Sequence, residues 1–231
     1  MTESPADLPL VLASGPDEDG LAVITLNRPE KKNALSIALR EEVVDLLGRL
    51  AVDEALKALI ITGSGGSFSA GFDLREFAVT DPGHTERLWR SSDLFHHAVH
   101  RFPLPVIAAV DGVAYAGGFD LAVLCDLRIA THRATFAHPE TALGPVVYGP
   151  LHDLVGGAVA RELVLTGREI DAREALRLHI ASELTDPREL AERTRNLARQ
   201  ISRAPREILV RNKAKFIARS AISPQTPTLD L

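Results

Sequence analysis

Short apolar segments alternate with longer amphipathic segments over residues 21–136, and this alternation limits the chain to few folds. Strands are predicted at 21–27 (LAVITLN), 58–63 (ALIITG), 105–110 (PVIAAV), 127–130 (LRIA) and 134–136 (ATF). The segments between these strands have helical character, which predicts helices at 35–50, 85–101 and 116–126. Strands that alternate with helices pair mainly in parallel and carry the helices outside the sheet. The predicted fold class is therefore α/β.

The chain from about residue 150 onward has a helical pattern. Helices are predicted at 172–179 behind an Asp171 cap, at 187–202 behind an Asp186 cap, and at 206–220 behind Pro205. No linker rich in Gly, Ser or Pro separates the two parts. We therefore expect a strand-bearing core over 1–150 and a helical region over 151–231.

The composition argues against several classes of function. A formal net charge of −5 over 231 residues disfavours nucleic-acid binding, which needs a basic patch. Cys125 is the single cysteine, so no internal disulfide can form, and it is expected to be an inert small hydrophobe. The sequence shows no signal peptide and no apolar run of about 18 residues. These features predict a cytoplasmic protein without a membrane span.

Three histidines share the predicted helix 85–101. His96 and His100 are four residues apart, a spacing that can bind a metal, and His97 lies between them. No carboxylate or cysteine completes a ligand set in the sequence. We therefore expect a solvated helical face and no metal site.

A pair of glycines, Gly117 and Gly118, precedes Asp120 in an otherwise apolar run. The first N–H groups of a helix lack intrahelical partners, and the macrodipole makes that end partly positive. Because glycine allows close approach to the backbone, this position suits an oxygen that carries negative charge. Tight packing of the helix against a strand explains the glycines as well, and the residues alone leave both explanations open.

A turn of small residues, 63–77 (GSGGSFSAGFDLREF), follows the strand predicted at 58–63. It lacks the Lys-Ser or Lys-Thr of a phosphate loop, and Phe68 stands where a dinucleotide fingerprint needs its last glycine. It approaches a hydrolase elbow around Ser69, but Ser67 replaces the first glycine of that motif. The turn is interpreted as one whose backbone N–H groups can face a ligand.

Glu140 lies in a largely uncharged segment, 135–144 (TFAHPETALG), directly after Pro139. A glutamate in such a place is either salt-bridged or functional. The residue taken alone favours a structural role, because glutamate is seldom buried without a partner.

Several stretches together resemble the enoyl-CoA hydratase/isomerase family, the crotonase superfamily. They follow its order and spacing from about residue 20 to about residue 220 and read LNRPEKKNALS, SFSAGFDL, PVIAAVDGVAYAGGFDLAVLCDLRIA, FAHPETALG and ELVLTGREIDAREAL. The resemblance implies a spiral of β-β-α units followed by a helical region that drives trimer formation. It also implies acyl-CoA thioester substrates, no cofactor beyond the coenzyme A of the substrate, and a homotrimer or a dimer of trimers.

The resemblance also implies roles for individual residues. The backbone N–H groups of Phe72 and Gly117 would form an oxyanion hole for the thioester oxygen, and Asp120 and Glu140 would be the catalytic carboxylates. The apolar surroundings should raise the pKa values of these carboxyl groups. Substrate and coenzyme A contacts are expected from Ala34, Ser69, Ala70, Arg75, Gly118 and Tyr148.

The chain departs from the family pattern in three ways. Hydratases usually carry glutamate at the position of Asp120, and the shorter side chain retracts the carboxylate by about 1.5 Å. Aspartate occurs there in dienoyl-CoA isomerases, whose further aspartate corresponds to Tyr148 in this chain. Tyr148 and His152, which stand in place of a Pro-Gly-Gly-rich turn, either face the acyl group or pack structurally. The usual final helical segment is also missing after about residue 220.

These departures leave three functions open. The first is an enoyl-CoA hydratase that adds water in the syn sense. The second is an enoyl- or dienoyl-CoA isomerase, and the third is a non-catalytic acyl-CoA-binding homologue.

Overall fold

A six-stranded sheet organises the protein. The computed structural model describes residues 9–142, 145–220 and 222–231. The strands lie in the order β1-β2-β3-β4-β6-β9, and all adjacent pairs are parallel except β1 with β2. They are β1 (Val11–Ser14), β2 (Leu21–Leu26), β3 (Ala58–Gly63), β4 (Val106–Val110), β6 (Leu127–Thr131) and β9 (Glu183–Thr185). The predicted α/β fold with mainly parallel pairing is confirmed.

A smaller three-stranded sheet lies beside the start of α3 (Gly117–Leu124). It joins β5 (Val113–Tyr115), β7 (Thr135–Ala137) and β8 (Ile170–Asp171). β5 pairs with β7 in parallel, and β7 pairs with β8 antiparallel. The strands β1, β5, β8 and β9 were not predicted, because segments of two to four residues carry few positions for a periodic signal. Of the strands this short, only β7 was predicted, at 134–136.

Three of the described α-helices begin at a side-chain cap, which Ser36, Asp81 and Asp171 supply. Ser36 accepts a hydrogen bond from the Leu39 N–H, and Asp81 accepts one from the His84 N–H. Asp81 therefore starts its helix at Pro82, three residues before the predicted start. Asp186 does not cap a helix, because α6 begins only at Leu190. The α-helices are α1 (Ile37–Ala51), α2 (Pro82–His100), α3 (Gly117–Leu124), α4 (Gly149–Thr166), α5 (Ala172–Arg177), α6 (Leu190–Ser202) and α7 (Arg206–Arg219).

Short 3-10 helices and one break complete the chain. Gly156 has φ 75° and ψ 162°, so α4 consists of two helical pieces that meet at this residue. The 3-10 helices are η2 (Pro29–Lys31), η3 (Glu76–Ala78), η4 (Pro139–Ala142) and η5 (Thr228–Asp230).

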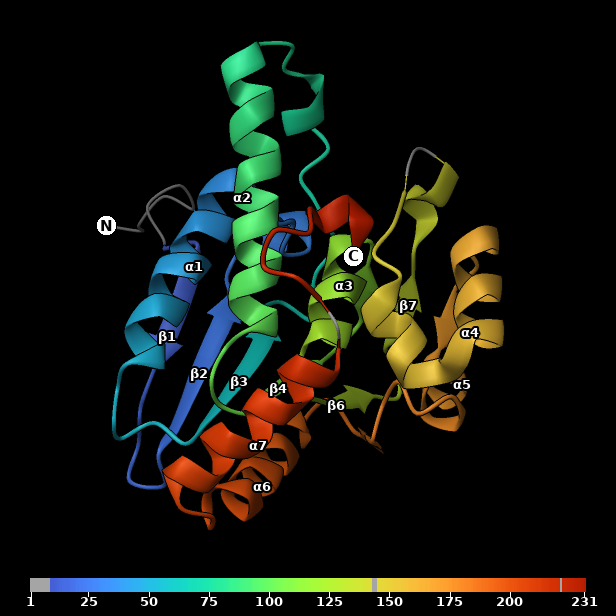
Figure 1. The fold of residues 1–231 in the computed structure, drawn as a ribbon. Coiled ribbons are helices and arrows are strands. Elements are labelled where there is room, and N and C mark those ends of the chain that lie inside the picture. The colour runs from blue at the N-terminus through green and yellow to red at the C-terminus, as the bar shows by residue number, and fades with distance from the viewer. Residues whose placement is uncertain (1–8, 143–144, 221) are drawn as a thin grey trace, which may run out of the picture.

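The large sheet buries both faces, as expected for parallel strands covered on each side. One face carries Ile24, Ile61 and Ala108, which share a core with residues of α1, α2 and α3. The other face carries Ile60 and Ile107, which pack with residues of α6. Figure 1 shows α1 and α2 side by side, α3 on the other side of α2 from α1, and α6 with α7 at the lower edge. This packing brings the start of α3 close to the turn after β3.

None of the described helices combines the length and the apolar character that a membrane-spanning segment requires.

Candidate active site

The start of α3 is shaped by Ala116, a residue in an unusual backbone conformation. Its φ of 51° and ψ of −130° lie in a region that a non-glycine residue rarely adopts. The Ala116 N–H binds the Ala137 carbonyl at 2.9 Å, and the Ala116 carbonyl accepts from the Phe119 and Asp120 N–H groups. These bonds hold the strained residue in place and leave the N–H groups of the first turn, at Gly117 and Gly118, for an external acceptor.

The turn at 69–73 packs directly against the start of α3. The Tyr115 N–H binds the Ser69 carbonyl at 3.0 Å, and Ser69 forms a bridge with Ala114. Gly71 has a φ of +86°, and a β-carbon added there would lie 2.6 Å from Ala116 Cβ and 3.2 Å from the Gly117 nitrogen. The chain therefore needs glycine at residue 71. Gly71 and Ala116, which precede Phe72 and Gly117, therefore lie next to each other.

The Phe72 amide lies at the edge of a backbone bridge. Leu35 and Phe72 form a parallel bridge in which the Leu35 N–H donates to the Gly71 carbonyl at 2.8 Å. This hydrogen bond engages the carbonyl before Phe72 and not the Phe72 amide. Two backbone segments from distant parts of the sequence thus approach each other at this point.

Asp120 is buried and lies between two histidines. Its Oδ1 accepts a hydrogen bond from His138 Nε2 at 2.8 Å, and its Oδ2 lies 3.9 Å from His96 Nε2. His96 comes from α2 and His138 from the residue after β7, so three elements meet at this carboxylate. Both histidine side chains are inaccessible to solvent. The buried charge of Asp120 is balanced by at least one direct partner.

Glu140 turns its carboxyl group toward the same cluster. It lies on η4, and its Oε2 is buried without a hydrogen-bond partner among the described residues. One ligand-type atom from each of Asp120, His138 and Glu140 lies within 4.8 Å of the others. Burial raises the pKa of Glu140 to about 7, with the charge of Asp120 adding to the effect and that of His138 opposing it. The expectation of a raised carboxyl pKa is therefore met at Glu140.

The pKa values of His138 and His96 shift in opposite directions. Burial would lower the pKa of His138, but the hydrogen bond to Asp120 and the charge of that carboxylate outweigh burial and raise it. Burial lowers the pKa of His96, which the charge of Asp120 opposes only in part. His138 is thus the histidine that favours the protonated form beside Asp120.

A cation is one possible occupant of this cluster. Asp120, His138 and Glu140 offer oxygen and nitrogen donors at a spacing that a divalent ion can bridge. The hydrogen bond between His138 and Asp120 already joins two of these donors, and a metal would have to replace it. The same three groups can equally hold and move protons.

The residues expected to line the coenzyme A path lie around the turn at 64–70. Asn33 Nδ2 donates to the Ser64 and Ser67 carbonyls, and the Ser69 hydroxyl donates to the Asn33 carbonyl at 2.9 Å. The Ala70 N–H binds the Lys32 carbonyl, which joins the same two segments. Ala34 and Ser69 are buried, Ala70 is half-buried and Arg75 is exposed. The structure thus brings Ala34, Ser69 and Ala70 together.

Gly118 packs against the turn at 69–73, whereas Tyr148 lies at the start of α4. A β-carbon on Gly118 would lie 2.4 Å from the Ser69 carbonyl oxygen, so this glycine permits close packing of α3 against the turn. Tyr148 is half-buried at the start of α4, and its ring lies 5.5 Å from the ring of the exposed His152. The packing explanation therefore holds for Gly118.

The expectation of a solvated histidine face on α2 is wrong for His96. This residue is 0% exposed, and its Nε2 is directed toward Asp120, whereas His97 and His100 are half-buried. His96 belongs to the buried stripe of α2 that includes Leu88, Phe95 and Val99. That stripe was the signal in the sequence that could have placed His96 inside. His138 gave no such signal, because it lies outside any long periodic segment.

The chain belongs to a known family. The structure has the crotonase fold: it superposes on an enoyl-CoA hydratase from Mycobacterium smegmatis with a TM-score of 0.85 and 33% identity, over 94% of this chain and 85% of that one. Residues 17–230 match the family Enoyl-CoA hydratase/isomerase. The chain is therefore a member of the enoyl-CoA hydratase/isomerase family.

Relatives within the family catalyse different reactions. The chain is 36% identical to a short-chain-enoyl-CoA hydratase from Clostridium acetobutylicum, over 81% of this chain and 74% of the relative. It is 34% identical to 4-chlorobenzoyl coenzyme A dehalogenase-2 from an Arthrobacter species, over 84% of this chain and 74% of the relative. Both names include a coenzyme A thioester, while the chemistry differs.

Proposed function

We propose that the protein is an enoyl-CoA hydratase that adds water to an α,β-unsaturated acyl-CoA thioester. The N–H groups of Phe72 and Gly117 polarise the thioester carbonyl, which makes the β-carbon electrophilic. Asp120 orients one water and helps to deprotonate it. Glu140 donates a proton to the α-carbon, and the addition is syn because both carboxyl groups act from one side of the substrate.

The close approach of Asp120 and Glu140 carries this proposal. One donor atom of each lies within 4.8 Å of the other. Two hydrogen bonds of ordinary length that meet at one water span about 4.5 Å, so the spacing suits a water held by both carboxyl groups. A Glu140 pKa of about 7 lets this group exist in both protonation states near neutral pH, as a proton donor requires.

A panel of thioesters tests the proposal. Purified protein is incubated with enoyl-CoA esters of several chain lengths and with a dienoyl-CoA, and the masses of the products are measured by mass spectrometry. We expect a gain of one water and loss of the enoyl thioester absorbance. Unchanged mass with every ester, or a product of equal mass with a shifted double bond, contradicts hydration.

The hydrogen bond from His138 to Asp120 favours a second candidate, an isomerase that moves a double bond. At 2.8 Å this bond engages one oxygen of Asp120, which leaves that oxygen less available to bind a water. Glu140 would then shuttle a proton between two carbons by itself. An isomerase needs the same oxyanion hole but no water.

Asparagine at position 120 separates the two candidates. If the reaction is hydration, D120N and Glu140→Gln should each reduce kcat by about 10²–10⁴-fold, because two acid–base groups share the chemistry. An isomerase should keep most of its activity in D120N and lose it in the Glu140 variant. The measurement is kcat for each purified variant on the thioester that the wild type converts best.

We also propose that the helical region 151–231 makes subunit contacts in a homotrimer or a dimer of trimers. Its exposed large apolar side chains support this: Leu165 is 78% exposed and Phe216 is 57% exposed.

A further inference from the structure

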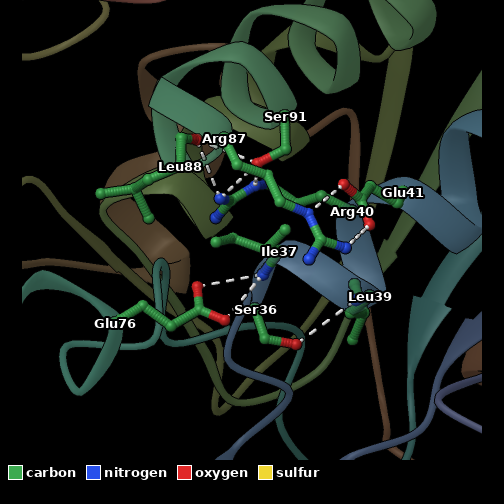
Figure 2. Close-up of polar contacts among 9 residues, drawn as sticks. All are labelled: Ser36, Ile37, Leu39, Arg40, Glu41, Glu76, Arg87, Leu88 and Ser91. Carbon is green, nitrogen blue, oxygen red and sulfur yellow. Dashed lines mark hydrogen bonds and ion pairs between the residues drawn. The ribbon is translucent and has the colours of Figure 1, made fainter. Parts of the chain in front are cut away.

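Arg40 is a fully buried arginine on α1. Its guanidinium donates to the Leu35 carbonyl at 2.6 Å, to the Leu88 carbonyl at 3.1 Å and to the Ser91 hydroxyl at 2.7 and 3.1 Å. Figure 2 shows the bonds to Leu88 and Ser91, which reach from α1 to α2. Arg40 is 0% exposed and lies on the buried face of α1, where the other residues are apolar.

The charge of Arg40 has no carboxylate in direct contact among the residues that the structure describes. Glu76 accepts from the Ile37 N–H at 2.9 and 3.0 Å, and Glu41 pairs with Arg87 on the outer side of α1 (Figure 2). Burial lowers the pKa of Arg40 to about 10, with the charges of Glu76 and Glu41 opposing it, so the group stays protonated at neutral pH. A buried cation held mainly by carbonyl and hydroxyl oxygens destabilises a fold, and its position calls for a reason.

The guanidinium lies against the first donor residue of the proposed oxyanion hole. Its Cζ is 4.3 Å from the centroid of the Phe72 ring, within cation–π range. The same ring packs against Gly117, where an added β-carbon would lie 2.9 Å from two of its carbons. Phe72 thus contacts both Arg40 and the residue that supplies the second donor.

Arg40 also reaches the backbone of the same segment. It binds the Leu35 carbonyl, and the Leu35 N–H binds the Gly71 carbonyl at 2.8 Å. Two hydrogen bonds therefore connect the guanidinium to the peptide group that contains the Phe72 nitrogen. The buried cation is therefore linked to this peptide in a poorly screened environment.

We propose that Arg40 is a positioning residue of the oxyanion hole, which orients the Phe72 amide and adds a fixed positive charge that stabilises the thioester oxygen as it gains negative charge. This inference rests on the proposed function. Preorganised charge aimed at a developing oxyanion is effective because it needs no reorganisation during the reaction. We expect Arg40→Met, which keeps the length and removes the charge, to reduce kcat/KM about tenfold or more.

The carbonyl stretch of a bound thioester measures this effect directly. Butyryl-CoA labelled with ¹³C at the thioester carbonyl is saturated, so it binds without being hydrated, and its infrared band moves to lower wavenumber as the carbonyl is polarised. We expect the wild type to lower the band relative to water, and R40M to lose a clear part of that shift. Arg40→Lys, which keeps a cation at this position, should show a band shift between those of R40M and the wild type. Arg87→Met is the matched control, since Arg87 is an exposed arginine paired with Glu41, and it should behave as wild type.

The outcomes separate the two proposals. A full wild-type shift in R40M that has the melting curve of a folded protein overturns the role of Arg40. No shift in the wild type overturns the oxyanion hole itself and with it the proposed function. If R40M does not fold, Arg40→Gln, which keeps hydrogen-bond donors and removes the charge, is measured in its place, and a shift equal to that of the wild type again overturns the inference.

Discussion

Replacing Glu140 with glutamine is expected to reduce turnover by about 10²–10⁴-fold while stabilising the folded protein above pH 7. The amide keeps the shape of the side chain but cannot exchange a proton with the α-carbon. The same change removes a carboxyl group that is costly to ionise, since burial raises its pKa to about 7 from an ordinary 4.5. Loss of activity with a gain in stability marks a residue kept for chemistry.

The stability gain has a defined pH window. Because the folded-state pKa of Glu140 is raised, the folded state binds this proton more tightly than the unfolded state. The contribution of the group is fully present below about pH 4.5 and is lost as pH rises through about 7. At pH 8 the wild type should therefore be less stable than E140Q by up to about 3 kcal/mol, and the two should converge near pH 4.5.

Urea unfolding at a series of pH values measures this difference. Glu54→Gln is the matched control, because Glu54 is an exposed glutamate beyond the end of α1, and it should change neither activity nor the pH dependence of stability. Equal stability of wild type and E140Q at every pH would show that Glu140 is solvated as an ordinary carboxylate. The combination expected here, an inactive and more stable variant, cannot arise from misfolding.

The periodic pattern of the chain predicted its layers well. Short apolar runs such as 58–63 and 105–110 form the buried strands β3 and β4, because a parallel sheet covered on both faces needs continuous apolar residues. Strands as short as β8, which has two residues, have no periodicity and exist only because the chain folds back against β7. Tertiary pairing, absent from any local window, decides such elements.

The candidate site was predicted unevenly for a related reason. Resemblance to a family pointed to Asp120 and Glu140, and the structure brings these two residues together. His96, His138 and Arg40 were missed, because a polar residue on a buried helical face or after a short strand contradicts the rule that links polarity to exposure. Local rules fail most often where a protein uses buried polar groups for chemistry, and all three residues surround the candidate active site.

His138→Ala is expected to lower the free energy of unfolding by about 3–5 kcal/mol at pH 6, because it leaves Asp120 buried without its partner. The pairing with Asp120 raises the pKa of His138 in the folded state. The stabilisation by this histidine is therefore complete below its unfolded pKa of about 6.5, and it declines as pH rises through the folded-state pKa. The deficit of H138A should therefore shrink in urea unfolding at pH 9. A deficit that is the same at pH 6 and pH 9 would mean that only packing was lost.

His138→Gln tests the electrostatic part of this pair, because glutamine is neutral at every pH and can still donate to Asp120. It should unfold with a smaller loss than H138A at pH 6, because it keeps the hydrogen bond to Asp120. The pH-dependent part of the loss should remain, because neither variant carries the charge of His138. The positive charge of His138 also lowers the pKa of Glu140, so its removal should move that pKa further above 7. The limb of the kcat profile that reports Glu140 should shift to higher pH in H138Q, whereas a role in packing alone would leave this limb in place. His138 then pairs with the water-orienting carboxylate and sets the pH at which the proton donor works.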